Sequence, residues 1–97
     1  MFEPLDFEWD DAKCRLNQRK HGLGFEFALS VFRDSDRYEY NVSRSEDGET
    51  RLKVLGRVSD RLFSVVFTIR DGSCRVISLR PANPKEERIH ANRSHEI

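Results

Sequence analysis

Two histidines, His21 and His90, lie on either side of a segment with a strong excess of positive charge. Residues 51–80 contain seven Lys or Arg and two Asp, a net charge of +5. Residues 1–50 contain twelve Asp or Glu and seven Lys or Arg, and the whole chain has a net charge of zero. The excess is therefore local, and a local basic surface can bind polyanions.

Together these side chains supply what RNA cleavage without a metal ion requires. A base removes the proton of the 2′-hydroxyl, an acid protonates the 5′-oxygen, and cations stabilise the crowded phosphate. Arginine suits the last task because its planar guanidinium contacts two phosphate oxygens at once. For any single arginine, a solvated position on a strand remains the simpler interpretation.

Other chemistries have less support in the sequence. The three histidines lack the spacing and the partners of a closed metal site, so we expect no metal or cofactor. Neither a glycine-rich phosphate loop nor a Gly-x-Ser-x-Gly elbow occurs. Cys14 and Cys74 are far apart, and free thiols in a reducing cytosol are favoured over one disulfide. Without an apolar run of ~18 residues or a signal peptide, we expect a cytoplasmic protein with no membrane contact.

Length and composition predict one domain spanning residues 1–97. The chain is 37% hydrophobic and 35% charged, which allows one thin core. We expect residues 1–6 to form an N-terminal extension and residues 83–97 to form a terminal helix with a frayed tail that includes His95.

The first elements are predicted to be a strand over residues 5–9 and a helix over residues 11–21. Asp10 suits the N-cap and Gly22 the left-handed position that follows the helix. Lys20 and His21 would occupy the last turn, where cations are favourable. An ordinary helix end therefore accounts for both residues, although their outer atoms could still meet a phosphate.

A second helix is predicted from an apolar stripe with helical spacing. The stripe consists of Phe25, Ala28, Leu29 and Phe32. Phe27 and Val31 lie off it and are expected to face a partner or a second packing layer.

Strands are predicted over residues 36–42, 50–59, 61–70 and 74–80, with a polar loop at residues 43–49. In the second strand, Leu52 and Val54 share one face, and Arg51, Lys53 and Leu55 share the other. A three-residue hairpin loop over residues 71–73 would give a definite register. The expected pairs are Phe67 with Ile77, Val66 with Ser78, Val65 with Leu79 and Ser64 with Arg80.

The chain is predicted to end in a helix capped by Asn83, with Pro84 at its first position and Glu86 at its third. The order of elements predicts an α+β domain: a strand, two helices packed on a four-stranded antiparallel sheet, and a short C-terminal helix. The helices are expected to cover one face of the sheet.

Several segments resemble, in this order and at these distances, the BrnT family of type II toxins. They are FEWDDAKCRLNQRKHG, FEFALSVFRD, DGETR, LGRVSD, VVFTIR, RVISLRPA and EERIH, and they extend from Phe7 to about His90. The resemblance implies a RelE-like fold and a metal-independent endoribonuclease that arrests translation. It also implies a BrnA-like antitoxin with a DNA-binding region, through which the complex reaches operator DNA, and two toxin copies in a heterotetramer.

The resemblance also marks candidate site residues. We predict Arg80, His90, His21 and Glu49 as catalytic residues, and Lys20, Arg51, Arg57 and Arg75 as RNA- or phosphate-binding residues; Ser78 is marked as well. Many relatives have a tyrosine where this chain has His90. Glu49 could act as a base, and it could also simply pair with Arg51.

Two non-catalytic functions stay open. The first is a binding module that keeps the fold but has lost the chemistry, which the missing tyrosine favours. The second is nucleic-acid binding without cleavage, through the basic segment of residues 51–80.

Overall fold

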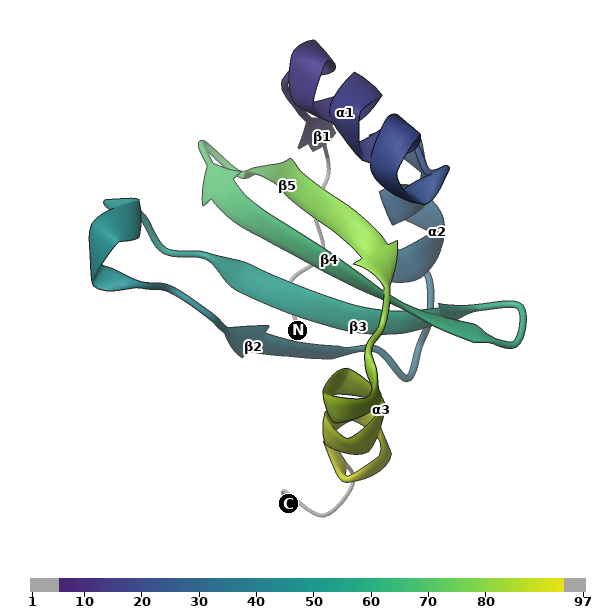
Figure 1. The fold of residues 1–97 in the computed structure, drawn as a ribbon. Coiled ribbons are helices and arrows are strands. Elements are labelled where there is room, and N and C mark those ends of the chain that lie inside the picture. The colour runs from purple at the N-terminus through teal and green to yellow at the C-terminus, as the bar shows by residue number, and fades with distance from the viewer. Residues whose placement is uncertain (1–5, 94–97) are drawn as a thin grey trace.

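The computed structural model describes residues 6–93, so the predicted start of the first strand at residue 5 and the tail with His95 lie outside the described residues. The helices are α1 (Asp11–His21), α2 (Ala28–Phe32) and α3 (Pro84–Ala91), with short 3₁₀ turns at Phe25–Phe27 and Ser45–Asp47. The strands are β1 (Asp6–Glu8), β2 (Tyr38–Asn41), β3 (Leu52–Val58), β4 (Arg61–Arg70) and β5 (Ser73–Pro81). The α+β class is confirmed (Figure 1).

One five-stranded sheet runs through the molecule in the order β1-β5-β4-β3-β2. Strands β2 to β5 are antiparallel neighbours, as predicted. The prediction of a four-stranded sheet was wrong in one respect, because β1 joins it as a fifth strand, parallel to β5. This pairing is short, from Asp6 opposite Ser73 to Glu8 opposite Arg75, so the rest of the outer edge of β5 is left to α1.

The caps of the long helices agree with the sequence. The Asp10 side chain accepts a hydrogen bond from the backbone N–H of Lys13 at 3.0 Å, and Gly22 ends α1 at φ 72°. At the start of α3, the Asn83 side chain accepts from the backbone N–H of Glu86 at 2.8 Å. The Glu86 carboxylate accepts in return from the backbone N–H of Asn83 at 2.9 Å. The reciprocal cap aims the Glu86 carboxylate back toward the end of β5.

The core lies between the sheet and the pair α1 and α2. Phe25, Ala28 and Phe32 are buried as predicted, but Val31 is fully buried and Leu29 only half-buried, which reverses their expected places. The cause is the 3₁₀ turn at Phe25–Phe27, whose three residues per turn change the phase of the helix that follows. Phe27 packs edge-on against Phe63, with ring centroids 4.8 Å apart.

The hairpin between β4 and β5 differs from its predicted register at one pair. Asp71 and Gly72 form a two-residue turn with φ 50° and 82°, and not the predicted three-residue loop. Phe67 consequently pairs with Val76, and a bulge makes Ile77 the extra residue. The other three predicted pairs, Val66 with Ser78, Val65 with Leu79 and Ser64 with Arg80, are confirmed.

The helices do not all cover the same face, which corrects the sequence expectation. α1 and α2 pack on the core face, which includes Val54 and Val65. α3 contacts Lys53 and Ser64, whose side chains alternate with these along β3 and β4 and therefore point to the opposite face. Figure 1 shows α3 well apart from α1 and α2, at the end of the segment that leaves β5.

Candidate active site

Polar and basic side chains line up across the sheet face on which α3 sits. Two rows follow directly from the strand register. One row consists of Tyr38, Leu55, Ser64 and Arg80, and the next of Tyr40, Lys53, Val66 and Ser78. The antiparallel pairing thus brings residues from four strands to one place.

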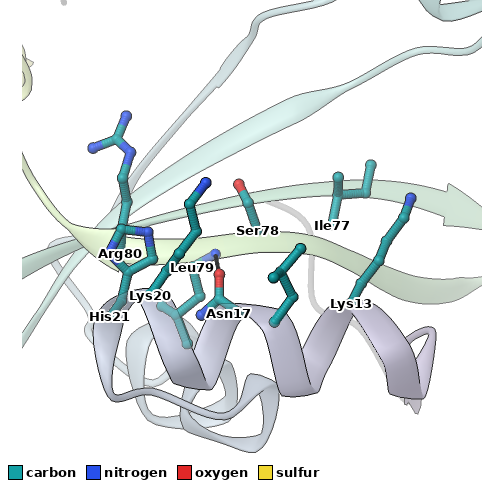
Figure 2. A pocket seen from close by; sticks show the side chains of 9 residues that line it. Lys13, Asn17, Lys20, His21, Ile77, Ser78, Leu79 and Arg80 are labelled. Atoms are coloured by element: carbon teal, nitrogen blue, oxygen red, sulfur yellow. Dashed lines mark hydrogen bonds between the residues drawn. The ribbon is translucent and has the colours of Figure 1, made fainter.

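A hollow of about 530 Å³ lies where α1 crosses the outer edge of β5. It is lined by Lys13, Leu16, Asn17, Lys20, His21, Ile77, Ser78, Leu79 and Arg80. Figure 2 shows Lys13 and Lys20 reaching from α1 to the same side as Ser78 and Arg80 of β5, with His21 beside Arg80. Lys20, His21 and Arg80, all predicted site residues, are therefore brought together although Arg80 is distant from the others in the sequence.

The ionisable side chains that line this hollow are all basic. Among the described residues that line it are Lys13, Lys20 and Arg80, a histidine and no carboxylate. A second hollow of about 320 Å³ is lined by Arg44, Arg51 and Lys53 and by one carboxylate, that of Asp47, and it shares Ile77 and Ser78 with the first. We call the two hollows together the basic groove.

Arg80 does not face the groove alone, because it is bound by Glu86 of α3. Arg80 donates two hydrogen bonds to this carboxylate, from Nη1 to Oε1 at 2.7 Å and from Nη2 to Oε2 at 2.9 Å. Lys53 Nζ donates to Oε2 at 2.6 Å, and the Ser64 hydroxyl donates to the same oxygen at 3.3 Å. Glu86 is only 2% exposed.

The protonation state of Glu86 follows from these contacts. Burial by itself would raise the pKa of the Glu86 carboxyl, but the hydrogen bonds from Arg80 and Lys53 outweigh it and bring the pKa down to about 2. The hydrogen bonds that Arg80 donates to Glu86 raise the pKa of Arg80. Burial, and next the negative charge of Glu86, raise the pKa of Tyr40 in the neighbouring row. At neutral pH, Glu86 is therefore an anion held between two cations.

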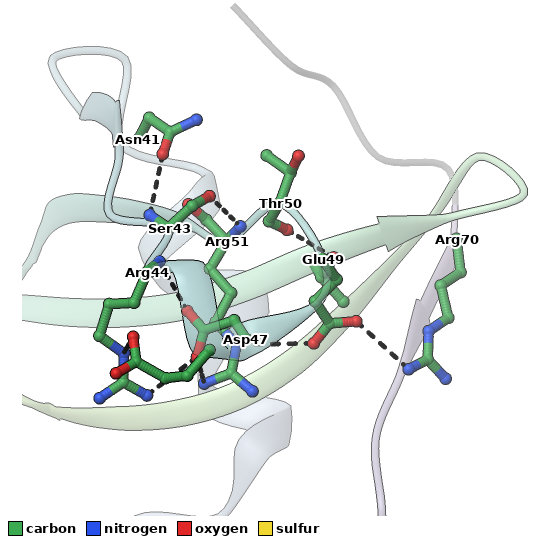
Figure 3. A network of polar contacts seen from close by, with 10 residues as sticks. Asn41, Ser43, Arg44, Asp47, Glu49, Thr50, Arg51 and Arg70 are labelled. Atoms are coloured by element: carbon green, nitrogen blue, oxygen red, sulfur yellow. Dashed lines mark hydrogen bonds and ion pairs between the residues drawn. The ribbon is translucent and has the colours of Figure 1, made fainter.

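Arg51 and Glu49 belong to a separate network at the edge of the groove, shown in Figure 3. Arg51 lies 3.6 Å from the carboxylate of Asp47 and 3.5 Å from that of Glu49. Glu49 also lies 3.4 Å from Arg70. Glu49 thus sits between two arginines as an ion-pair partner, and Arg51 lines the basic groove.

Two predicted phosphate-binding residues lie outside the groove. Arg57 is exposed, 3.5 Å from Glu87 of α3, and its backbone N–H donates to Asp34 at 2.7 Å. Arg75 pairs with Glu8 of β1 at 3.5 Å. Neither residue lines either hollow of the groove as the structure describes it.

His90 is likewise separate from His21. It is 3% exposed, on the inner side of α3, and its Nδ1 lies 3.2 Å from Arg93. Its Nε2 is buried without a hydrogen-bond partner among the described residues. Burial, and then the positive charge of Arg93, lower the pKa of His90, so the ring is neutral at pH 7.

Sequence reasoning missed the two residues that complete the Arg80 contact. The sequence does contain an indication for Lys53. It alternates with Leu52 and Val54, which places it on the same sheet face as Arg51, a predicted site residue. Glu86 was predicted only as a capping residue. Its second role depends on where α3 lies against the sheet, which no local pattern encodes.

Two general properties concern metals and membranes. Within residues 6–93, no group of three or more His, Cys, Asp or Glu side chains is arranged to hold a metal ion. None of the helices described is both long enough and apolar enough to cross a membrane.

Comparison with known proteins identifies the family. A search of curated proteins found no match. A family model described as the ribonuclease toxin BrnT of type II toxin-antitoxin systems matches residues 9–86, a span that includes α1, the whole sheet from β2 to β5, and Glu86. With most of its length matched, and with a basic groove that suits a polyanionic substrate, the chain belongs to the BrnT family of ribonuclease toxins.

Proposed function

We propose that this protein is a metal-independent endoribonuclease that binds RNA in the basic groove and arrests translation. The observation that carries the proposal is the convergence of Lys20, His21 and Arg80 on one hollow lined by no carboxylate of the described residues. Family membership supports RNA as the substrate.

The groups divide into roles by their chemistry. Histidine is the side chain that exchanges protons near neutral pH, and His21 is exposed at the groove. We assign to it the proton transfer at the 2′-hydroxyl or the 5′-oxygen. Arg80 and Lys20 stabilise the charge that develops on the phosphate, and Arg51 holds a neighbouring phosphate. His90 is buried away from the groove, and we assign it a packing role.

The partner follows from the family, since type II toxins act with an antitoxin. We propose a BrnA-like antitoxin with a DNA-binding region, two toxin copies in the complex, and contact with operator DNA through the antitoxin. We also propose that the α+β fold is RelE-like. The mass of the complex purified after co-expression with the neighbouring gene product tests the stoichiometry.

A cleavage assay with groove variants tests the enzymatic proposal. Purified protein is incubated with labelled RNA in the presence of a chelator, with and without ribosomes. Because general acid–base help contributes about 10²–10⁴-fold, His21→Gln is expected to reduce the rate by at least ~100-fold. Lys20→Ala is expected to weaken RNA binding. Both residues are exposed, so the fold is retained.

Arg19→Ala is the matched control. Arg19 lies in the same last turn of α1, is exposed, and does not line the groove. Equal rates for Arg19→Ala and His21→Gln would overturn the assignment of His21. If the wild-type protein leaves RNA and translation untouched, the non-catalytic binding module replaces the enzyme.

A further inference from the structure

The contacts of Glu86 are those expected of a bound phosphate. Its two oxygens receive a bidentate pair of hydrogen bonds from Arg80, an ammonium donor from Lys53 and a hydroxyl donor from Ser64. Carboxylate and phosphate share this recognition geometry, because both present two oxygens to a planar guanidinium. The side chain that fills the position belongs to the protein itself.

The position of Glu86 is next to the basic groove. A hollow of about 270 Å³ at the start of α3 is lined by Tyr40, Val42, Lys53, Asn83, Lys85, Glu86 and Ile89. It shares Val42 and Lys53 with the part of the groove that contains Arg51. Arg80 lines the other part of the groove, beside His21. An RNA strand along the groove would therefore pass the Glu86 carboxylate.

The attachment of α3 to the sheet is light compared with that of the other helices. Within the described chain, its backbone approaches the sheet less closely than those of α1 and α2. α3 is eight residues long and polar, so it is marginal as an isolated helix. Its outer contact, between Glu87 and Arg57, joins two half-exposed side chains and contributes little. The attachment of its first turn therefore depends largely on Glu86, while the buried His90 holds the second turn.

We propose that Arg80 and Lys53 form a phosphate subsite for the RNA backbone, filled in this structure by the Glu86 carboxylate, so that RNA binding displaces the first turn of α3. The inference rests on the proposed function for the identity of the ligand. An RNA strand competes with Glu86 because its adjacent phosphates also reach Lys20 and Arg51, which one carboxylate does not. Lys53 becomes a phosphate-binding residue, and Glu86 sets how readily the subsite opens.

Binding of an RNA that cannot be cleaved tests this directly. A fluorescent 2′-O-methyl oligonucleotide is titrated into the wild-type protein, Glu86→Gln and Glu87→Gln, with folding checked by circular dichroism. We expect Glu86→Gln to bind at least ~10-fold more tightly than the wild type. The salt dependence should also steepen by about 0.7 per additional phosphate neutralised.

Glu87→Gln controls for general electrostatics. It removes the same charge from the same helix and frees Arg57, but it leaves the Arg80 and Lys53 contacts intact. We expect its affinity to stay within about twofold of the wild-type value. If Glu86→Gln binds no more tightly than Glu87→Gln, Glu86 merely positions Arg80 and the inference is wrong.

A second comparison tests the shared subsite even if Glu86→Gln is less stable than the wild type. Lys53→Ala should weaken oligonucleotide binding much more in the Glu86→Gln background than in the wild type, where Lys53 is already engaged. Equal losses in both backgrounds would contradict the shared subsite.

Amide hydrogen exchange of the wild-type protein gives a third test. Saturating oligonucleotide should increase exchange in residues 85–88 and not in α1. Unchanged or greater protection of residues 85–88 would also contradict the shared subsite.

Because the oligonucleotide lacks a reactive 2′-hydroxyl, these outcomes are independent of cleavage. The proposed function would be refuted by a wild-type protein that does not cleave RNA. The shared phosphate subsite would be refuted by an oligonucleotide affinity that is unchanged in Glu86→Gln.

Discussion

Asn17 and Leu79 are joined by a hydrogen bond that attaches α1 to the outer edge of β5. The backbone N–H of Leu79 donates to Asn17 Oδ1 at 3.3 Å, and Asn17 Nδ2 donates to the Leu23 carbonyl at 2.9 Å. Strand β1 pairs only with residues 73–75, so Asn17 supplies an acceptor farther along this edge. The contact determines where Lys20 and His21, on the next turn of α1, lie relative to Arg80.

Asn17→Ala is expected to lower the free energy of unfolding by about 1–3 kcal/mol, because it leaves the buried N–H of Leu79 and the partly buried carbonyl of Leu23 without this partner. For a domain of this size, each kcal/mol corresponds to a fall in Tm of roughly 4–8 °C. Thermal unfolding followed by circular dichroism measures the change. Gln18→Ala, at an exposed neighbouring position, is the control and should change Tm little. Equal shifts for the two variants would argue against the edge contact.

The Arg80–Glu86 contact predicts a loss of stability in acid. The pKa of Glu86 is about 2, below its ordinary value of 4.5. The folded state therefore gains the full contribution above pH 4.5 and loses it as the pH falls toward 2. The contribution is on the order of 3 kcal/mol, since one pKa unit corresponds to about 1.4 kcal/mol.

Urea unfolding at pH 6 and pH 3 measures this effect in the wild type and in Glu86→Gln. The wild type should be clearly more stable at pH 6, and the difference between the two proteins should shrink at pH 3. A difference that stays constant across this range would show that Glu86 titrates normally.

The lowered pKa of His90 predicts a second loss of stability, at a higher pH than the loss due to Glu86. Burial and Arg93 lower its pKa, so the unfolded chain takes up a proton first as the pH falls below about 6.5. The backbone of Asp36 and the negative charge of Asp34 act in the opposite direction, while the positive charge of Arg57 adds to the effect of Arg93. Wild-type Tm should therefore fall between pH 7.5 and pH 5.5.

His90→Leu is the matching variant. It removes the titratable ring whose pKa is lowered on folding, so part of the decrease in Tm between pH 7.5 and pH 5.5 should disappear. RNA cleavage should be kept, because proton transfer is assigned to His21. Loss of cleavage in a folded His90→Leu protein would return His90 to the catalytic residues.

Gly56 is predicted to tolerate no side chain. A Cβ at this position would lie 2.6 Å from the carbonyl oxygen of Val31, where α2 packs on β3. Gly56→Ala should cost about 1–3 kcal/mol, because the backbone must shift to make room. Gly24→Ala is the control, since the atoms nearest to its Cβ would be those of the movable Glu26 carboxylate. Similar unfolding midpoints for both alanine variants would contradict this prediction.

The two cysteines are free thiols, as predicted, and are expected to differ in reactivity. Cys74 is fully buried, and burial raises the pKa of its thiol to about 12. It should remain unreactive toward a thiol reagent at pH 8 until the protein unfolds. Colorimetric titration of Cys14→Ser isolates Cys74. Rapid modification of that variant in its native state would show that the core opens on the time scale of the assay.

The local elements could be predicted from the sequence because their signals are themselves local. Asp10, Gly22 and Asn83 cap helices as expected, and the alternation of Leu52 and Val54 gives the correct core face of β3. Each depends on neighbours within a few residues. The family resemblance likewise depended on motifs that can be seen in the sequence.

The errors occurred where distant segments had to be placed against each other. The addition of β1 to the sheet and the burial of Val31 depend on such packing, and the bulge at Ile77 depends on a turn one residue shorter than expected. Predicted site residues also separated into several clusters, since residue type says nothing about which face or edge a side chain reaches.

The sequence by itself determined the family, the α+β class and the basic character of the segment that contains Arg80. Only the tertiary structure decided that Arg80 meets Lys20 and His21 beside α1. It also decided that the guanidinium of Arg80 is bound to the Glu86 carboxylate. The physical reason is that an ion pair of this kind requires two elements, β5 and α3, to be held at a fixed distance by the packing of the whole sheet.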